Sequence, residues 1–194
     1  MDLMQSTEDC CSQNGFSPIN QFALVSYLPD PLGSFLDQLR LRLVPDCKPH
    51  AHVTILPPRP LCGYPDQAAS EIRRLADEFS PFTVRLGDIA KFPVSNVIYI
   101  QLDSGTKELR EMYTAMNCGA CSYREAFQYH PHITLAQNIP PGTADDVLAQ
   151  AQKEWAVYRG SRSFRVETLS FVQNTSICRW LDLAEISLAA HVVR

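Results

Sequence analysis

Histidine is scarce in this chain, and basic excess and long apolar runs are absent: five of the 194 residues are histidine and the formal net charge is −4. This charge argues against a broad basic surface that grips long nucleic acid by its phosphates. No apolar stretch reaches the roughly 20 residues that a membrane-spanning helix needs. The first residues have neither a positive start nor an apolar run, so they predict no secretory signal. We therefore expect a cytoplasmic protein with a small ligand or the end of a polynucleotide as its partner.

Cysteine occurs seven times, an odd number whose spacing indicates no disulfide framework. Without a secretory signal, this favours free thiols in a reducing compartment. Cys118 and Cys121 form a Cys-x-x-C pair, a pattern typical of redox motifs and of half zinc sites. Because no second pair accompanies it, we interpret both as structural thiols.

The polar, aperiodic residues 1–20 predict a flexible tail, followed by a single domain over residues 21–194. The apolar periodicity of that domain predicts alternating helices and strands. The short "PVSN" between two strand patterns favours a hairpin. Helices are expected over 32–43, 66–79, 105–117 and 143–156, and strands over 22–29, 52–56, 82–92, 97–103, 132–136, 163–173 and 179–188.

The order of elements repeats once, over about residues 50–103 and about 130–188. Each copy contains a histidine-bearing strand, a helix and two further strands. The first "FTVRL" begins 30 residues after His52, and the matching "FRVET" begins 32 residues after His132. Two copies with so long a period predict a pseudo-symmetric pair of lobes.

Four of the five histidines lie in two copies of one pattern, "HAHVTILPP" at 50–58 and "HPHITLAQN" at 130–138. Because side chains alternate along a strand, His52 and Thr54 share one face while the aliphatic residues between and after them point to the other. The second copy divides in the same way. If the two lobes pack about a pseudo-twofold axis, the two polar faces meet.

One imidazole on each side of a cleft is suited to in-line displacement at phosphorus. A neutral imidazole accepts the proton of the nucleophile while a protonated one donates to the leaving oxygen, and an ordinary pKa of about 6.5 permits both forms. Threonine hydroxyls can donate to the non-bridging phosphate oxygens. This scheme requires no metal ion and no cofactor. The candidates are His52 and His132 as acid and base, with Thr54 and Thr134 as phosphate ligands.

The paired "HVT" and "HIT" motifs resemble those of the two-histidine (2H) phosphoesterase superfamily, which includes 2′,5′ RNA ligase-like proteins and 2′,3′-cyclic nucleotide phosphodiesterases. The resemblance covers roughly residues 20–190. It implies a bilobal α+β fold in which two antiparallel sheets line a central groove, with the helices outside. It also implies that His52 and His132 are catalytic and that Thr54 and Thr134 bind the phosphate.

On this basis we expect a metal-independent phosphodiesterase that hydrolyses 2′,3′-cyclic phosphates or 2′,5′ linkages of nucleotides or RNA ends. Reversible 2′,5′ ligation would use the same groups. The protein is expected to be a monomer without a membrane or an extended nucleic-acid surface as partner. Gln137 stands where many ligase-like members carry an arginine, which leaves the substrate open.

Two alternatives remain open at this point. His50 and His130 make each motif His-x-His-x-Thr, and four converging imidazoles can bind zinc, iron or copper. Against a metal site, no Asp or Glu lies within a few residues of either motif on the expected faces, and the adjacent prolines Pro49 and Pro131 place these two histidines at strand entrances. The second alternative is a module that binds a nucleotide without turning it over.

Several further residues near the motifs have two readings each. The aromatic ones either stack on a nucleobase or fill the core. The arginines either meet a second phosphate or remain solvated. The aromatic residues are Phe92, Tyr123, Phe127 and Tyr129; the arginines are Arg59 and Arg124; and His191, outside the repeat, has no expected role.

Overall fold

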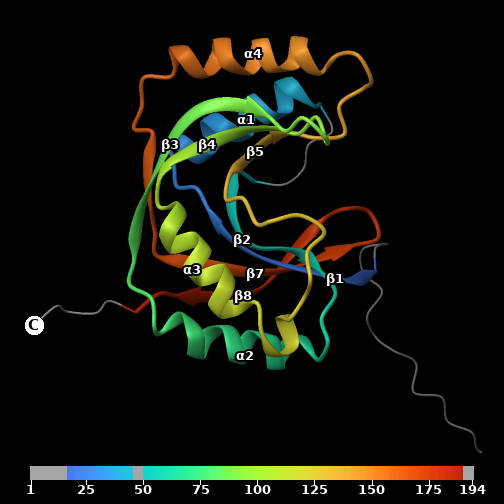
Figure 1. The fold of residues 1–194 in the computed structure, drawn as a ribbon, viewed down its shortest axis with the longest axis vertical. Helices are drawn as coiled ribbons and strands as arrows, with labels where there is room; N and C mark the ends of the chain where they lie inside the picture. Colours follow the sequence, from blue (N-terminus) through green and yellow to red (C-terminus); the bar gives the residue numbers. More distant parts are fainter. Residues whose placement is uncertain (1–16, 46–49, 190–194) are drawn as a thin grey trace, which may run out of the picture.

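Two four-stranded sheets form the centre of the protein in the computed structural model, which describes residues 17–45 and 50–189. Figure 1 shows one pair of helices beyond each sheet. The elements are β1 (Pro18–Tyr27), α1 (Leu32–Leu43), β2 (His52–Arg59), α2 (Pro65–Ala76), β3 (Phe82–Lys91), β4 (Ile98–Ser104), α3 (Thr106–Met116), the 3₁₀ turn η1 (Gly119–Cys121), β5 (Ile133–Ala136), α4 (Ala144–Val157), β6 (Ser163–Val166), β7 (Thr168–Thr175) and β8 (Trp180–Ser187).

The strand order is β2-β1-β7-β8 in the first sheet and β5-β4-β3-β6 in the second. Every pair of neighbouring strands is antiparallel. The predicted α+β fold with two antiparallel sheets is therefore confirmed. β2, which begins at His52, and β5, which begins directly after His132, each lie at an edge of their sheet.

The predicted elements are present, with small shifts at their ends. The strand expected over 163–173 is two strands, because the chain breaks at Glu167 between β6 and β7. β1 begins at Pro18, so the last residues of the expected tail belong to a strand. Residues 1–16 of that tail lie outside the described residues, as do Cys10, Cys11, Cys47, Pro49 and His191.

The helices cover the sheets through apolar stripes. In α1 the buried leucines 32, 36, 39 and 43 recur every three or four residues, the spacing of one helix face. α1 packs on β5 and α4, α4 packs on β3, α3 packs on β2, and α2 packs on β8. Each fully buried leucine stabilises the fold by about 1.5–3 kcal/mol. Within the described ranges, no helix is long and apolar enough to cross a membrane.

In the structure the repeat includes more elements than the sequence pattern indicated. The last strand of each repeat pairs with the sheet of the other repeat. Strand, helix, strand, helix and strand occur first as β1-α1-β2-α2-β3 and again, with β6 inserted before the last strand, as β4-α3-β5-α4-β7. β3 leaves the first sheet to pair with β4, and β7 leaves the second sheet to pair with β1. Each sheet is therefore built from both halves of the chain. The two sheets do not correspond to the repeats about 50–103 and about 130–188.

Candidate active site

The two His-x-Thr motifs occupy equivalent positions on β2 and just before and within β5, and these two strands contact each other. Val53 and Ile55 are fully buried, whereas His52 and Thr54 are half-buried. In the second motif His132 and Thr134 are likewise half-buried while the aliphatic residues beside them lie in the core. The alternation expected of the motifs is observed, and each strand presents one imidazole and one hydroxyl on its open face.

Each motif histidine is held by the main chain of the residue two positions earlier. Nδ1 of His52 lies 2.6 Å from the carbonyl oxygen of His50, and Nδ1 of His132 lies 2.6 Å from that of His130. A carbonyl oxygen only accepts, so both Nδ1 atoms carry the proton. The Nε2 atoms therefore have free lone pairs in the neutral rings. No described residue hydrogen-bonds to either Nε2 or to the hydroxyls of Thr54 and Thr134.

Two side chains of helix α1, Arg40 and Asp37, hydrogen-bond to the first motif. Nη1 of Arg40 donates to the His50 carbonyl at 3.2 Å, the same oxygen that accepts from His52. Asp37 accepts from the backbone N–H of Ala51 and pairs with Nδ1 of His50 at 2.9 Å. The His50 side chain is 79% exposed, so this residue lies at the rim. A buried arginine thus lies close behind the His52 imidazole.

Aromatic rings flank the histidines on both sheets. Tyr27, opposite His52 in the β1–β2 pairing, meets the rings of His50 and His52 edge-on. Its hydroxyl donates to Asp182 at 2.9 Å. On the second sheet, stacked Phe92 and Tyr99, with centroids 4.0 Å apart, meet His130 and His132 edge-on. These contacts restrict rotation of the imidazoles.

Both motif histidines favour the neutral form. Burial is the main reason that the pKa of His52 falls to about 4, and the positive charges of Arg40 and of a protonated His132 lower it further, against the effect of the His50 carbonyl. Burial also lowers the pKa of His132, where the His130 carbonyl opposes the shift. The charge of His132 acts on His52, which agrees with the contact between β2 and β5. His52, with the buried arginine behind it, is the weaker base.

The segment that leads to the second motif is fastened to β2. Arg59, 2% exposed, pairs with Glu125 at 2.6 Å and donates to the side-chain oxygen of Asn117 at 2.7 Å. The Tyr129 hydroxyl donates to the Thr54 carbonyl at 2.6 Å, and its ring stacks on Tyr113. Residues 125–129, called the edge segment below, therefore run along β2 in the opposite direction. Both readings of Arg59, solvated or phosphate-binding, are wrong because its charge is buried and paired.

Four aromatic residues were expected either to stack on a base or to fill the core, and the structure shows which of them are packed and which are exposed. Tyr129 is packed against Tyr113, and Phe92 is stacked on Tyr99, so neither presents a free ring face on that side. Tyr123 and Phe127 are exposed by 40% and 77%. The core-filling reading therefore fails for Phe127.

The cysteine pair and the His-x-His pairs differ in their surroundings. Cys121 is buried, and burial raises the pKa of its thiol to about 11, which makes it a poor nucleophile, whereas Cys118 is exposed.

Among the described residues, no three His, Cys, Asp or Glu side chains are arranged to hold a metal ion. The carboxylate that does reach a motif, Asp37, comes from α1 and not from the neighbouring sequence.

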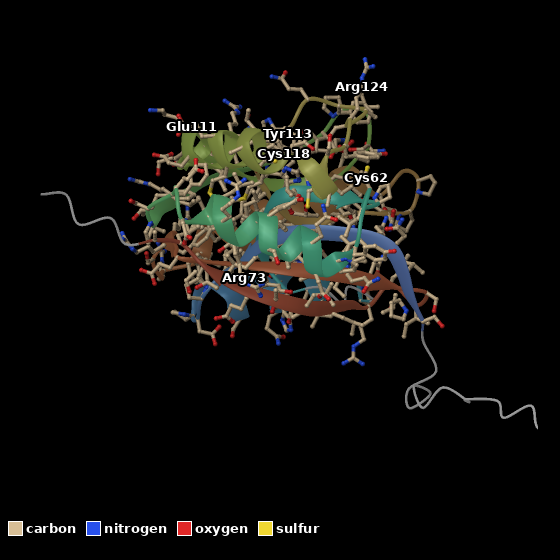
Figure 2. The ribbon with its side chains drawn as sticks, turned by 90° about the horizontal axis from the view of Figure 1, so that it is seen from below. Cys62, Arg73, Glu111, Tyr113, Cys118 and Arg124 are labelled. Atoms are coloured by element: carbon tan, nitrogen blue, oxygen red, sulfur yellow. The ribbon has the colours of Figure 1, made fainter. Side chains whose placement is uncertain are left out.

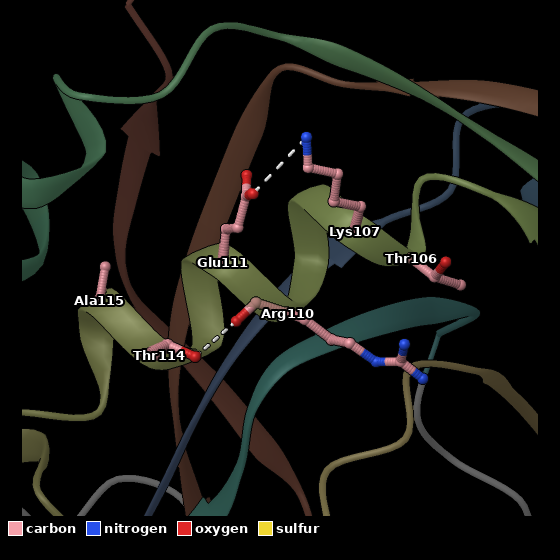
Figure 3. A pocket seen from close by; sticks show the side chains of 6 residues that line it. All are labelled: Thr106, Lys107, Arg110, Glu111, Thr114 and Ala115. Atoms are coloured by element: carbon pink, nitrogen blue, oxygen red, sulfur yellow. Dashed lines mark hydrogen bonds and ion pairs between the residues drawn. The ribbon is translucent and has the colours of Figure 1, made fainter.

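A hollow of about 510 Å³ lies along α3 and is lined by Thr106, Lys107, Arg110, Glu111, Thr114 and Ala115. Figure 3 shows Lys107 reaching to Glu111, an ion pair of 3.9 Å, while Arg110 extends away from both. The motif histidines are not part of this hollow. After burial, the charge of Arg110 is the second cause of the lowered pKa of His130, so this cation lies near the second motif. Gln137, after β5, is exposed.

The sequence did not reveal the groups that hold the imidazoles. The two main-chain carbonyls carry no side-chain signature, and Arg40 and Asp37 belong to a helix pattern that precedes the motif. The flanking tyrosines did leave a trace, because Val-x-Tyr occurs both at 25–27 and at 97–99. Extending the repeat upstream to include β1 and β4 would have identified Tyr27 and Tyr99 as partners of the motifs.

Comparisons with known proteins agree with this geometry. Residues 28–176 match the profile of the 2′-5′ RNA ligase superfamily. A protein of Geobacillus kaustophilus that is provisionally named a phosphoesterase is 25% identical over 139 residues, which cover 67% of this chain and 76% of that protein.

Solved structures show the same fold at lower identity. E. coli LigT without ligand has a TM-score of 0.58 and 16% identity, with 89% of this chain and 99% of LigT covered. Kluyveromyces marxianus Usb1 has a TM-score of 0.52 and 12% identity, with 87% and 98% covered. LigT has also been solved with phosphate and with 3′-AMP, and Usb1 with uridine monophosphate.

Proposed function

The chain belongs to the 2′-5′ RNA ligase superfamily, and from this premise we propose that it is a metal-independent phosphodiesterase acting on 2′,3′-cyclic phosphates or 2′,5′ linkages of nucleotides or RNA ends. His52 and His132 would be its acid and base. Thr54 and Thr134 would bind the non-bridging phosphate oxygens. Reversible ligation would use the same four side chains.

One observation supports this proposal above all others: two facing strands each carry an imidazole whose Nδ1 is fixed by a main-chain carbonyl and whose Nε2 is free. A fixed tautomer with Nε2 available is the requirement for proton transfer at a defined position. The matching arrangement on both strands suits a reaction that takes a proton on one side of phosphorus and supplies one on the other.

The charges around the two histidines indicate which one acts as the general base and which one as the general acid. His52, with a pKa of about 4 and a buried arginine behind it, stays neutral and accepts the proton of the attacking water. Burial and the charge of His130 lower the pKa of His132, and the negative phosphate between the strands would favour its protonated form. It then donates to the ribose oxygen that leaves as the P–O bond breaks. The product is a phosphate monoester.

The nucleotide character of the substrate is supported by the fold relatives. LigT is crystallised with 3′-AMP and Usb1 with uridine monophosphate, both nucleoside monophosphates. The two threonine hydroxyls beside the imidazoles are suited to a phosphate of this kind. The net charge of −4 favours a short or terminal substrate over a long one.

The proposal is tested by hydrolysis of the four 2′,3′-cyclic nucleotides with excess EDTA present throughout. We expect turnover by the wild type and a loss of about 10²–10⁴-fold in His52→Ala and in His132→Ala. His191→Ala removes a histidine outside both motifs and serves as the matched control.

Turnover that disappears with EDTA and returns with added metal would contradict the proposal and make the His-x-His pairs ligands. Binding of the cyclic nucleotides without turnover would instead indicate a binding module. The isomer of the product shows which ester bond is broken.

A further inference from the structure

The edge segment holds an exposed aromatic ring at a fixed place beside the site. Glu125 at its start is fastened to Arg59, and Tyr129 at its end is fastened to the Thr54 carbonyl. Phe127 lies midway, two residues from each fastening, and is 77% exposed. The next residue after the segment is His130, the first histidine of the second motif.

Phe127 is exposed although the residues on both sides of it are firmly held. Residues on both sides of it are anchored, Glu125 by its ion pair with Arg59 and Tyr129 by its hydrogen bond to the Thr54 carbonyl. Single exposed apolar side chains are common on proteins, but an unpacked ring on an anchored segment next to a candidate site is a feature typical of binding surfaces.

Two neighbours of Phe127 suit the same kind of ligand. The backbone N–H of Tyr123 donates to the side-chain oxygen of Asn117 at 2.9 Å, and its carbonyl accepts from that amide at 3.0 Å. Its ring lies against the guanidinium of Arg59, 5.8 Å from the ring centroid, so this ring is also held in place. Arg124 extends into solvent in Figure 2. No carboxylate of the described residues lies within ion-pair distance of its guanidinium. Residues 123–127 thus present two rings with an unpaired cation between them in sequence.

We propose that Tyr123, Arg124 and Phe127 form a binding surface for the nucleotides that adjoin the reacting phosphate in a single-stranded RNA end. The inference rests on the proposed function and narrows its substrate class to an oligonucleotide end. Bases stack on exposed aromatic rings without regard to sequence, and arginine attracts the phosphates between them.

The position of the surface limits how much RNA it contacts. Phe127 is three positions before His130, a backbone span of at most about 11 Å, so the ring reaches a nucleotide close to the reacting one. The net charge of −4 does not suit a longer track of phosphates. Phe127 therefore lies within one or two nucleotides of the site, and Tyr123 and Arg124 continue the surface away from it toward the Arg59 end of β2.

The test compares two substrates in the full-length protein: a 2′,3′-cyclic mononucleotide and a trinucleotide that ends in a 2′,3′-cyclic phosphate. Phe127→Ala is expected to lower kcat/KM for the trinucleotide about 5- to 100-fold while leaving the mononucleotide unchanged, because one stacked base is lost. Phe127→Trp, which keeps a ring, should retain the preference for the trinucleotide. Tyr64→Ala, a change at another exposed ring, should alter neither substrate.

Equal effects of Phe127→Ala on both substrates, or none, would overturn the inference. So would a change from dimer to monomer in Phe127→Ala, measured by sedimentation, since the ring would then bind a second copy of the chain.

Fluorescence anisotropy with a labelled trinucleotide 3′-phosphate separates this inference from the proposed function. If neither substrate is turned over, the proposed function fails. Weaker trinucleotide binding by Phe127→Ala than by the wild type would still support the surface, and equal binding would still refute it.

Discussion

At the scale of single residues, the two candidate histidines differ more in their surroundings than in their motifs. Both donate through Nδ1 to a carbonyl, yet the charge of the buried Arg40 lowers the pKa of His52, whereas the charge that lowers the pKa of His132 is that of His130. A positive charge near an imidazole disfavours its protonated form. Under the proposed function, the same local pattern would provide a base on one strand and an acid on the other.

The pH dependence of kcat/KM follows from these shifts. His52 must be neutral, so activity should rise with a midpoint near pH 4, and His132 must be protonated, so activity should fall with a midpoint below the usual 6.5. The optimum is expected in the acidic range. Arg40→Met should move the rising limb to higher pH, because the cation that lowers the pKa of His52 is removed. A profile that still increases above pH 8 would contradict the assignment.

The threonine hydroxyls are expected to act on the phosphate and not on the fold. Thr54→Val and Thr134→Val keep the side-chain shape and should each lower kcat/KM by about 10- to 100-fold, since one hydrogen bond to a developing charge is lost. The free energy of unfolding should not fall, because no described residue bonds to either hydroxyl. Steady-state kinetics and urea unfolding measure both effects. Thr83→Val, on an exposed position of β3, is the control.

At the scale of elements, the edge segment connects the two motifs. Tyr129 precedes the second motif directly, and its hydroxyl binds the carbonyl of a residue in the first. The Arg59–Glu125 pair fastens the other end of the segment to the end of β2. The distance between the two imidazoles therefore depends both on this segment and on the packing of the two sheets.

Tyr129→Phe tests that connection, because it removes one hydrogen bond and keeps the ring that stacks on Tyr113. We expect kcat to fall about tenfold with little change in KM, and the free energy of unfolding to fall by about 1 kcal/mol. Tyr64→Phe makes the same chemical change at an exposed ring and should have no effect. A loss of stability with unchanged kcat would leave Tyr129 a purely structural residue.

The helices and strands were predictable because their signal is local. α1 begins and ends where its leucine spacing begins and ends, and alternation placed His52 and Thr54 on one face. The exchange of β3 and β7 was not predictable, because strand partners depend on packing between distant segments. The buried Arg59 was misread for the same reason: its partner Glu125 lies 66 residues away and gives no local sign.

At the scale of the whole molecule, the negative net charge restricts the electrostatic contribution to binding. If the site holds one phosphate of a cyclic mononucleotide, its KM should rise only about threefold between 50 and 200 mM salt. Steady-state kinetics at several salt concentrations measure this dependence. A change above tenfold would mean that several phosphates or a wider basic field take part.

The exchange of the last strand of each repeat has a consequence for how the chain acquires its structure. The first sheet places β1, near the amino terminus, beside β7, and their paired residues, such as Val25 and Ser170, are about 145 positions apart. During synthesis the first histidine strand, β2, emerges long before β7 and β8, and its sheet stays incomplete until those two strands have been made. Pairings of such long separation are closed slowly. We therefore expect the two histidine strands to reach their final positions together, only after β7 has paired with β1.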